Sequence, residues 1–282
     1  MSRYRAKRPF ATSSLTAPFL RRVATLPDKI VAGQFPFTLP FLAGGELGLN
    51  FAKPVTIFVG ENGTGNSTLL EAIAQHSGFN PQGGSRDNNY RYGDGAEETG
   101  LAPALRLTWL PKVSRGFFFR AESFFNFASY IEETYRGDGR LTPWTERHLH
   151  HHSHGEVFLA MFERRFGAAE NSLYLLDEPE AALSPERQLE LLAAIAERVP
   201  TGRVQYIIAT HSPLLMACPG ADLLLFNHRG IQRASLRDTP HIKLYERFFR
   251  DPEGFLDEAV RRIAEERRAA EIPDAAGTDV EP

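Results

Sequence analysis

The sequence predicts an α/β protein built on a mostly parallel sheet with helices on its faces. Two observations lead to this prediction: short, almost wholly apolar runs recur along the chain, and helical patterns alternate with them. Runs without a polar face are typical of strands buried on both sides. Because alternation of such strands with helices favours parallel pairing, we expect one helix-flanked sheet.

Four apolar runs are the expected strands: residues 55–59 (VTIFV), 172–177 (SLYLLD), 204–209 (VQYIIA) and 222–226 (DLLLF). A further strand that turns into a helix is expected in FFFRAESFFNFASYIEETY. The stretch from about 79 to 112 is rich in Gly, Asn, Pro and Asp, which indicates a long loop.

Three helices are expected from apolar spacing and start signals. The first follows the first strand and places Leu69, Leu70 and Ile73 on one face before Gly78. The second begins at Ser184–Pro185, where a capping hydroxyl precedes proline; its expected inner residues are Leu189, Leu192, Ile195 and Val199. The third begins at Asp251–Pro252; its expected inner residues are Phe255, Leu256, Ala259, Val260 and Ile263.

Composition bounds the class of protein. The 282 residues carry a net charge of −3, so no global basic field demands nucleic acid or an anionic membrane. The single cysteine, Cys218, cannot form an internal disulfide, which fits the cytoplasm. No window approaches about 18 consecutive apolar residues, so we expect no membrane span. The expected organisation is a basic tail (1–16), one domain (17–267) with a helical insertion at about 113–170, and a flexible tail (268–282).

The stretch GENGTGNST follows the first strand and precedes the first helix. Glycines let the backbone curl so that its N–H groups face phosphate oxygens, and the helix adds its N-terminal dipole. The pattern departs from G-x-x-x-x-G-K-[ST] at one position, where asparagine replaces the lysine that reaches the outer phosphates. The candidate phosphate-binding residues are Gly60, Glu61, Asn62, Gly63, Thr64, Gly65, Asn66, Ser67 and Thr68.

Two further strand ends carry polar groups suited to phosphate chemistry. Asp177 and Glu178 end an apolar strand, and adjacent carboxylates there are costly unless they meet a cation. Asp177 and Ser67 would hold Mg²⁺, and Glu178 would orient and deprotonate water. His211 follows the next apolar strand and could reach the same phosphate. The alternative is that the acids only cap a turn and that the histidine is structural.

A fourth motif, SHGEV, precedes a helical pattern with Phe158, Phe162 and Phe166 on one face. Ser153 and Gly155 offer a hydroxyl and free backbone N–H groups at a helix start, which makes a second phosphate-seeking surface. Taken alone it is also consistent with an ordinary capped helix.

In this order, the four motifs resemble those of the ABC-type ATPases, over roughly residues 17–265. GENGTGNST stands for Walker A, SHGEV for the signature, LYLLDEPEAALSP for Walker B with its D-loop, and ATHSP for the switch histidine. More narrowly, the chain resembles the compact soluble bacterial branch often catalogued as AAA-family ATPases. The resemblance implies ATP and Mg²⁺ as cofactors and a P-loop NTPase fold.

The resemblance also implies a head-to-tail homodimer that sandwiches two nucleotides. Ser153, Gly155 and Glu156 of one subunit would face the nucleotide of the other, and residues 182–184 would form the D-loop across the interface. The family places a metal-touching glutamine after an early strand; here Glu122 is assigned to that place, beside Arg120. The adenine-stacking aromatic stays open among Phe35, Phe37 and Phe41.

Two residues depart from the family pattern. Val157 stands where serine is usual, and Asn66 stands at the lysine position. One lost charge-assisted hydrogen bond is worth roughly 1.5–3 kcal/mol, about 10- to 100-fold in affinity, and a lost cation could lower the rate by a further ~10²–10³. Three explanations stay open: a natural weak ATPase that uses nucleotide as a ligand, an engineered or drifted variant, or a substitute cation such as Arg120.

Three roles fit these motifs. The first is an ATPase or ATP-gated switch acting on an unidentified protein partner. The second is the energy subunit of a membrane permease, and the third is a DNA-processing or defence ATPase, supported only by the basic N-terminus. The histidine cluster HLHHHSH (148–154) is interpreted as a polar loop at the dimer interface, with metal binding as the alternative.

Overall fold

The computed structural model describes residues 15–86, 100–124, 129, 158–160, 162–163 and 170–270. The chain divides into two compact units, Met1–Ala234 and Ser235–Pro282. This division differs from the single domain that we expected over residues 17–267. The site residues that the sequence indicates belong to the first unit.

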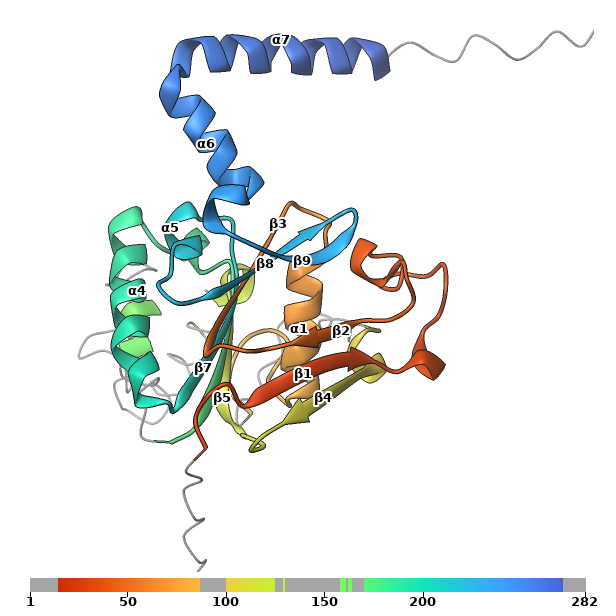
Figure 1. Cartoon of the computed structure of the whole chain (residues 1–282), viewed down its shortest axis with the longest axis vertical. Helices are drawn as coiled ribbons and strands as arrows, with labels where there is room; N and C mark the ends of the chain where they lie inside the picture. The colour runs from red at the N-terminus through yellow and green to blue at the C-terminus, as the bar shows by residue number, and fades with distance from the viewer. Residues whose placement is uncertain are drawn as a thin grey trace, which may run out of the picture. The chain divides into compact units, whose positions relative to one another are not determined.

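A six-stranded sheet runs through the first unit in the order β5-β6-β7-β3-β8-β9 (Figure 1). Five strands are parallel, and β9 pairs antiparallel with β8. All four apolar runs are strands, and β3, β6 and β7 are buried along their whole length. The predicted mostly parallel sheet is therefore confirmed. The strands are β3 (Val55–Gly60), β5 (Arg115–Arg120), β6 (Ser172–Asp177), β7 (Val204–Ala209), β8 (Asp222–Asn227) and β9 (Gly230–Ala234).

A smaller antiparallel sheet has the order β2-β1-β4. Its strands are β1 (Leu20–Thr25), β2 (Gly48–Asn50) and β4 (Leu105–Trp109). The prediction of a long loop over 79–112 is wrong at residues 105–109, which form β4. In this strand Leu105 is buried, and Arg106 and Thr108 are exposed. This alternation of period two is the mark of a half-buried strand, and the glycine- and proline-rich surroundings concealed it.

Helices cover both faces of the main sheet. Helix α1 (Asn66–His76) contacts strands of both sheets, and Figure 1 shows α4 (Pro185–Arg198) on the opposite side of the main sheet. The predicted inner face of α1 is confirmed, since Leu69, Leu70 and Ile73 are fully buried. The unit also contains α5 (Pro213–Met216) and 3-10 helices at Pro27–Lys29, Pro40–Leu42, Ala102–Ala104, Pro179–Ala182 (η5) and Val199–Thr201.

The predicted inner face of α4 is partly wrong. Ile195 is buried as expected, but Gln188 and Leu191 are buried in place of Leu189 and Leu192, and Leu189 is 46% exposed. The helix is turned toward Gln188 because its amide finds hydrogen-bond partners inside the protein, Leu183 O and Ser212 Oγ. A pattern of apolar residues alone cannot reveal a polar residue that is buried and satisfied.

Aromatic side chains attach the helical segment before β6 to the sheet. Phe158 and Phe162, expected on one face, are both fully buried. The ring centroid of Phe158 lies 4.3 Å from that of Phe119, and the ring centroid of Phe162 lies 6.1 Å from that of Tyr206. Phe166, the third residue of that pattern, lies outside the described residues.

The second unit holds a 3-10 helix (Leu236–Asp238), α6 (Pro240–Arg250) and α7 (Pro252–Ala270). The two helices contact each other, and Arg247 Nη2 lies 3.2 Å from Glu258 Oε1. The expected inner face of α7 is wrong, because Leu256, Val260 and Ile263 are 53%, 66% and 42% exposed. Among the described residues of this unit, α6 is the only other helix as long as three turns, so most of the apolar face of α7 is left uncovered by them.

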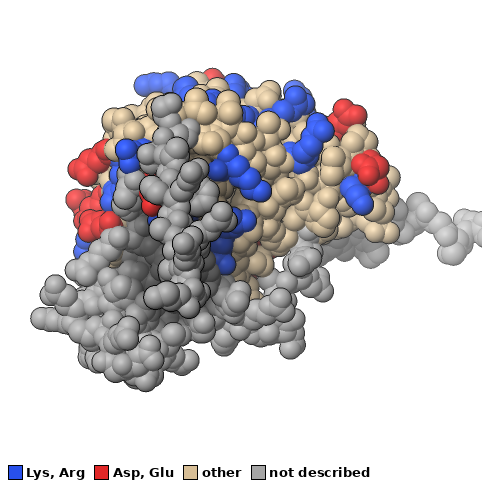
Figure 2. All heavy atoms as spheres, turned by 90° about the horizontal axis from the view of Figure 1, so that it is seen from below, with Lys and Arg blue, Asp and Glu red and all other residues tan. Residues whose placement is uncertain are grey.

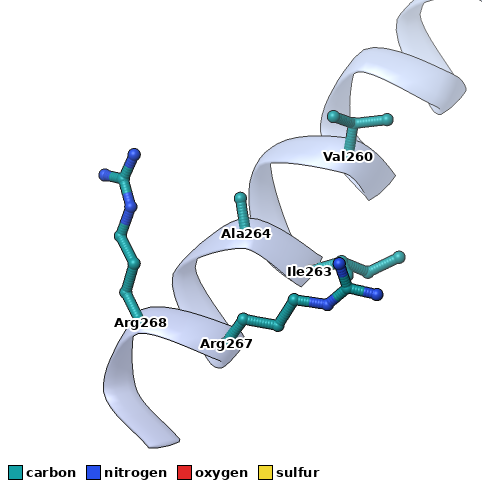
Figure 3. A pocket seen from close by; sticks show the side chains of 5 residues that line it. All are labelled: Val260, Ile263, Ala264, Arg267 and Arg268. Carbon is teal, nitrogen blue, oxygen red and sulfur yellow. The ribbon is translucent and has the colours of Figure 1, made fainter. Parts of the chain in front are cut away.

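A shallow hollow runs along α7 and is lined by Val260, Ile263, Ala264, Arg267 and Arg268 (Figure 3). Because one helix supplies every lining residue, the hollow is an open surface rather than an enclosed cavity. Among the described helices, none is long and apolar enough to cross a membrane.

Candidate active site

The glycine-rich turn joins β3 to α1, as the motif requires. Gly65 is the N-cap of α1 and adopts a φ of 89°, a conformation that L side chains rarely adopt. A Cβ atom there would lie 2.6 Å from Phe41 Cε1 and 2.9 Å from Leu39 Cδ1. Conformation and space therefore both require glycine at this position.

The start of the turn is equally constrained. Gly60 ends β3, and a Cβ atom on it would lie 2.9 Å from Phe226 Cβ. The hydroxyl of Thr64 donates a hydrogen bond of 2.7 Å to Glu61 O, which closes the turn. Between them, Glu61, Asn62 and Gly63 are exposed. The tip of the turn is thus open to solvent, while both ends are packed.

Asn66 lies at the first position of α1 and is only 5% exposed. Among the described residues, its Nδ2 atom has no hydrogen-bond partner. A buried donor left unpaired costs about 1–3 kcal/mol. The first N–H groups of a helix also lack partners within the helix. The start of α1 therefore gathers donors that an anion such as phosphate would satisfy.

Ser67 and Asp177 connect the turn to the end of β6. The Ser67 hydroxyl donates a hydrogen bond of 2.7 Å to Asp177 Oδ1, across 110 residues of sequence. Asp177 is buried, and this burial raises the pKa of its carboxyl to about 6, although Ser67 and Arg120 act in the opposite direction. A buried carboxylate beside a hydroxyl is a donor set that suits Mg²⁺, whose charge would remove the desolvation penalty.

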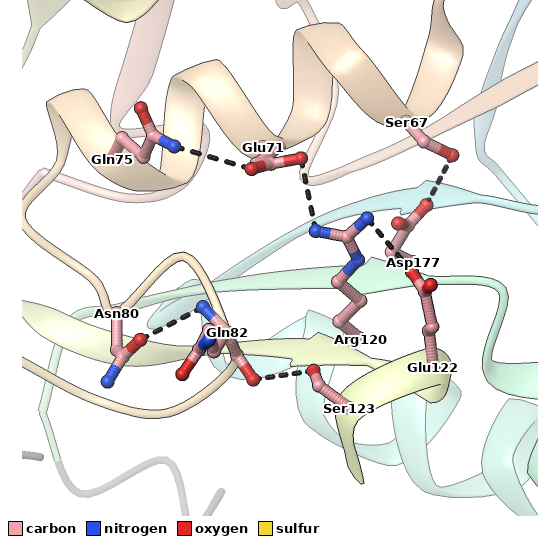
Figure 4. A network of polar contacts seen from close by, with 9 residues as sticks. All are labelled: Ser67, Glu71, Gln75, Asn80, Gln82, Arg120, Glu122, Ser123 and Asp177. Atoms are coloured by element: carbon pink, nitrogen blue, oxygen red, sulfur yellow. Dashed lines mark hydrogen bonds and ion pairs between the residues drawn. The ribbon is translucent and has the colours of Figure 1, made fainter. Parts of the chain in front are cut away.

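Arg120 lies at the end of β5 between two carboxylates (Figure 4). Its Nη1 is 3.2 Å from Glu71 Oε2, and its Nη2 is 3.0 Å from Glu122 Oε2. Burial raises the pKa of Glu71, which the guanidinium opposes. Glu122, expected at the metal, is 80% exposed and paired with Arg120. Sequence reasoning missed Glu71; the available signal was an acid inside the apolar run of α1.

Glu178 and His211 lie together at the ends of β6 and β7. The two strands are parallel neighbours that align Asp177 with Ala209, and Glu178 N donates to Ala209 O at 2.9 Å. Glu178 has a φ of 49°, the one positive value among the described non-glycine residues. This conformation costs of order 1 kcal/mol and often marks a functional position. It brings Glu178 Oε1 to 3.6 Å from His211 Nε2.

The expected signature motif and histidine cluster cannot be compared with the structure, whereas most of the expected D-loop can. Ser153, Gly155, Glu156 and Val157, with the histidine cluster 148–154, lie outside the described residues. In the expected D-loop, Leu183 is buried and the Ser184 hydroxyl accepts the N–H of Arg187, which caps α4.

The three aromatic candidates differ in exposure. Phe37 and Phe41 are buried, and the ring of Phe41 packs on Phe226 at 5.7 Å. Phe35 is 70% exposed, so of the three it alone presents its ring for stacking on a base. The sequence could not distinguish them, because all three are phenylalanines in one apolar stretch.

Residues 157–217 match a protein family described as "AAA domain, putative AbiEii toxin, Type IV TA system". The matched stretch contains Asp177, Glu178 and His211 and ends before β8. Among curated proteins, none matches the chain. The glycine-rich turn between β3 and α1, the Ser67–Asp177 contact and the mostly parallel sheet agree with the P-loop fold that the sequence predicts.

Solved structures resemble the chain at low identity. They include an ABC transporter in an inward-facing conformation (18% identity, TM-score 0.40, covering 68% of this chain and 76% of that one). The SMC head domain from Thermotoga maritima is 15% identical with a TM-score of 0.42, and the match covers 77% of this chain and 99% of that one. MJ1267, an ATP-binding cassette of an ABC transporter, is 16% identical with a TM-score of 0.44, and the match covers 81% of this chain and 99% of that one. At these TM-scores the likeness carries no conclusion about substrate or partner.

Proposed function

We propose that the chain binds Mg·ATP at the Walker A turn and hydrolyses it slowly, or uses it as a regulatory ligand. The observation that carries this proposal is the 2.7 Å hydrogen bond between Ser67 Oγ and Asp177 Oδ1. It joins two motifs that are far apart in sequence, in the arrangement that a phosphate-bound metal requires. The unpaired amide of Asn66 and the raised pKa of Asp177 support the same ligand.

In this proposal the residues have separate tasks. Backbone N–H groups of residues 60–68 bind the phosphates, and Ser67 and Asp177 would hold Mg²⁺, which supplies charge neutralisation of the phosphoryl oxygens. Glu178 orients the attacking water and accepts its proton. His211 faces the same carboxylate and would donate to the outer phosphate. Phe35 is the candidate for stacking on adenine.

Asn66 is the reason to expect weak chemistry. Its amide can donate one hydrogen bond to phosphate but brings no charge to the transition state. Arg120 is the candidate for a substitute cation, but its guanidinium already faces Glu71 and Glu122. To contact a phosphate, Arg120 would have to give up one of these ion pairs. We therefore favour impaired hydrolysis over full replacement of the missing lysine by Arg120.

Head-to-tail dimerisation and a cytoplasmic location belong to this proposal as well. The dimer rests on the SHGEV motif, and the location rests on the single cysteine. No observation favours the permease subunit or the toxin that the family description names. For the DNA-processing alternative, Figure 2 shows Lys and Arg side chains in several separate groups on one face, with Asp and Glu at its edges. The described Lys and Arg residues on this face therefore form no continuous basic stripe of the kind that DNA binding favours.

Calorimetric titration of the chain with ATP, with and without Mg²⁺, tests the proposal. We expect binding that Mg²⁺ strengthens, and we expect Ser67→Ala to remove most of that strengthening, about tenfold or more. Ser235→Ala, in the other unit, is the matched control and should bind as the unaltered chain does. Absence of ATP binding at millimolar concentrations by a folded protein would contradict the proposed function.

A further inference from the structure

We propose that Glu180 is a positioning residue, which fixes His211 opposite Glu178 by accepting the hydrogen bond of the His211 backbone N–H. Glu180 Oε1 lies 2.6 Å from His211 N. Bonds from an N–H group to a carboxylate are short and roughly twice as strong as neutral ones. The inference rests on the proposed function, because His211 needs an exact position only if it acts on nucleotide.

Two acids of one short turn contact His211, one at its imidazole and the other at its backbone N–H. Glu178 precedes η5 and Glu180 lies within it. The first carboxylate faces the imidazole at 3.6 Å, and the second binds the backbone at 2.6 Å. With the backbone anchored, rotation about the side-chain bonds is the main freedom left to the imidazole. This is the arrangement expected of a histidine that must meet a phosphate in one orientation.

A second, buried connection joins the same two segments. Gln188 Nε2 donates to Leu183 O at 3.1 Å, and Ser212 Oγ donates to Gln188 Oε1 at 2.5 Å. Gln188 and Ser212 are each 8% exposed. The turn after Glu178 and the segment after β7 are thus tied at two points, one on each side of the His211–Ser212 peptide bond. A change at residues 179–184 would be transmitted to His211.

Stability alone does not account for Glu180. Its second oxygen, Oε2, is buried and has no hydrogen-bond partner among the described residues. A buried unpaired carboxylate oxygen is unfavourable. Two of the nearby backbone groups of the turn are already satisfied within it, since Ala181 N donates to Glu178 O and Leu183 N to Glu180 O. The acid at position 180 therefore serves the contact with His211.

The direct test follows the His211 amide in protein labelled with ¹⁵N-histidine, with the signal assigned from a His211→Gln variant. We expect Glu180→Ala to shift this signal upfield and to speed its exchange with solvent by at least about tenfold. Glu180→Gln keeps an acceptor oxygen and should restore most of the protection. Glu186→Ala, an exposed acid on the next helix, is the matched control. An unchanged His211 amide in a folded Glu180→Ala protein would overturn the proposal.

A second measurement connects the bond to function, in an Asn66→Lys background where turnover is expected. Glu180→Ala should lower kcat without weakening Mg·ATP binding, and the double variant with His211→Ala should be no slower than His211→Ala alone. Effects that multiply would overturn the positioning role. If the Asn66→Lys protein binds and hydrolyses nothing, the proposed function fails, while the amide measurement still decides the contact.

Discussion

Among single residues, Asp177 shows how this site opposes the stability of the fold. The carboxyl is buried at the end of an apolar strand, and burial raises its pKa from 3.8 to about 6. A raised carboxyl pKa means that the folded state binds the proton more tightly than the unfolded state. The contribution of this carboxyl to stability is therefore highest below pH about 4, falls between about 4 and 6, and is constant above. At neutral pH the ionised group destabilises the metal-free fold.

We expect Asp177→Asn to stabilise the protein in the presence of a chelator, by about 2–3 kcal/mol at pH 7.5 as an order of magnitude. The amide oxygen can still accept the hydrogen bond from Ser67, so only the charge is removed. At pH 5 the gain should be roughly half as large, because the folded carboxyl is then mostly protonated. Denaturant unfolding at both pH values checks this. A variant that is less stable at pH 7.5 would contradict the account.

Gly65 gives a second prediction at this scale, with Gly63 as its matched control. Both have positive φ values, 89° and 80°, but a Cβ atom meets Phe41 and Leu39 only at position 65. Gly63→Ala should cost about 1 kcal/mol from conformation alone. Gly65→Ala should cost measurably more, because the ring of Phe41 and the methyl groups of Leu39 must shift. Equal losses in the midpoint of thermal unfolding would show that the contact is unimportant.

Among helices and strands, the sequence predicted those that have simple patterns. The runs that became β3, β6, β7 and β8 are apolar throughout, and this property alone revealed them. Helix α4 was found from its Ser184–Pro185 start, but its buried face was not, because Gln188 is buried with its own partners. Apolar spacing on α7 predicted burial that this helix does not have.

The site was predictable to the same extent. Glu178 and His211 follow neighbouring strands, so their proximity could be predicted from the sequence. The motifs likewise predicted that Ser67 and Asp177 lie close together. The contacts of Arg120 with Glu71 and of Glu180 with His211 were not foreseeable, because they depend on side-chain directions that no sequence period encodes. The same holds for Glu122, which the structure pairs with Arg120.

The face of α4 can be tested with a pair of leucines. Leu191 is fully buried and Leu189 is 46% exposed. We expect Leu191→Ala to lower the free energy of unfolding by about 2–5 kcal/mol, the usual loss for a core leucine. Leu189→Ala should lower it by less than about 1 kcal/mol. If Leu189→Ala lowers the free energy of unfolding more than Leu191→Ala in a urea titration, the buried face of α4 is the one that the sequence predicted.

At the scale of the whole molecule, the core belongs to the first unit. Its cluster of buried apolar residues begins at Phe19 and ends at Phe226, with Ile231 packed against it. No described residue of the unit Ser235–Pro282 belongs to that cluster, which agrees with the division of the chain at Ala234. All described residues of the proposed site also lie before this point.

We therefore expect a chain ending at Ala234 to fold and to bind Mg·ATP as the full chain does. Its unfolding midpoint should lie within about 4 °C of the full-length value, the shift that ~1 kcal/mol produces at this size. Scanning calorimetry and calorimetric titration of both chains provide the comparison. An aggregated or unfolded truncated chain would mean that the second unit is needed for folding.

The most direct test compares Mg·ATP turnover and molecular mass in solution for the chain as it stands and for Asn66→Lys. The account predicts that lysine raises turnover by at least about 10²-fold and produces a dimer that depends on ATP. If neither protein hydrolyses ATP or dimerises, Asn66 is not what limits the site, and an impaired ABC-type ATPase is the wrong description of this chain.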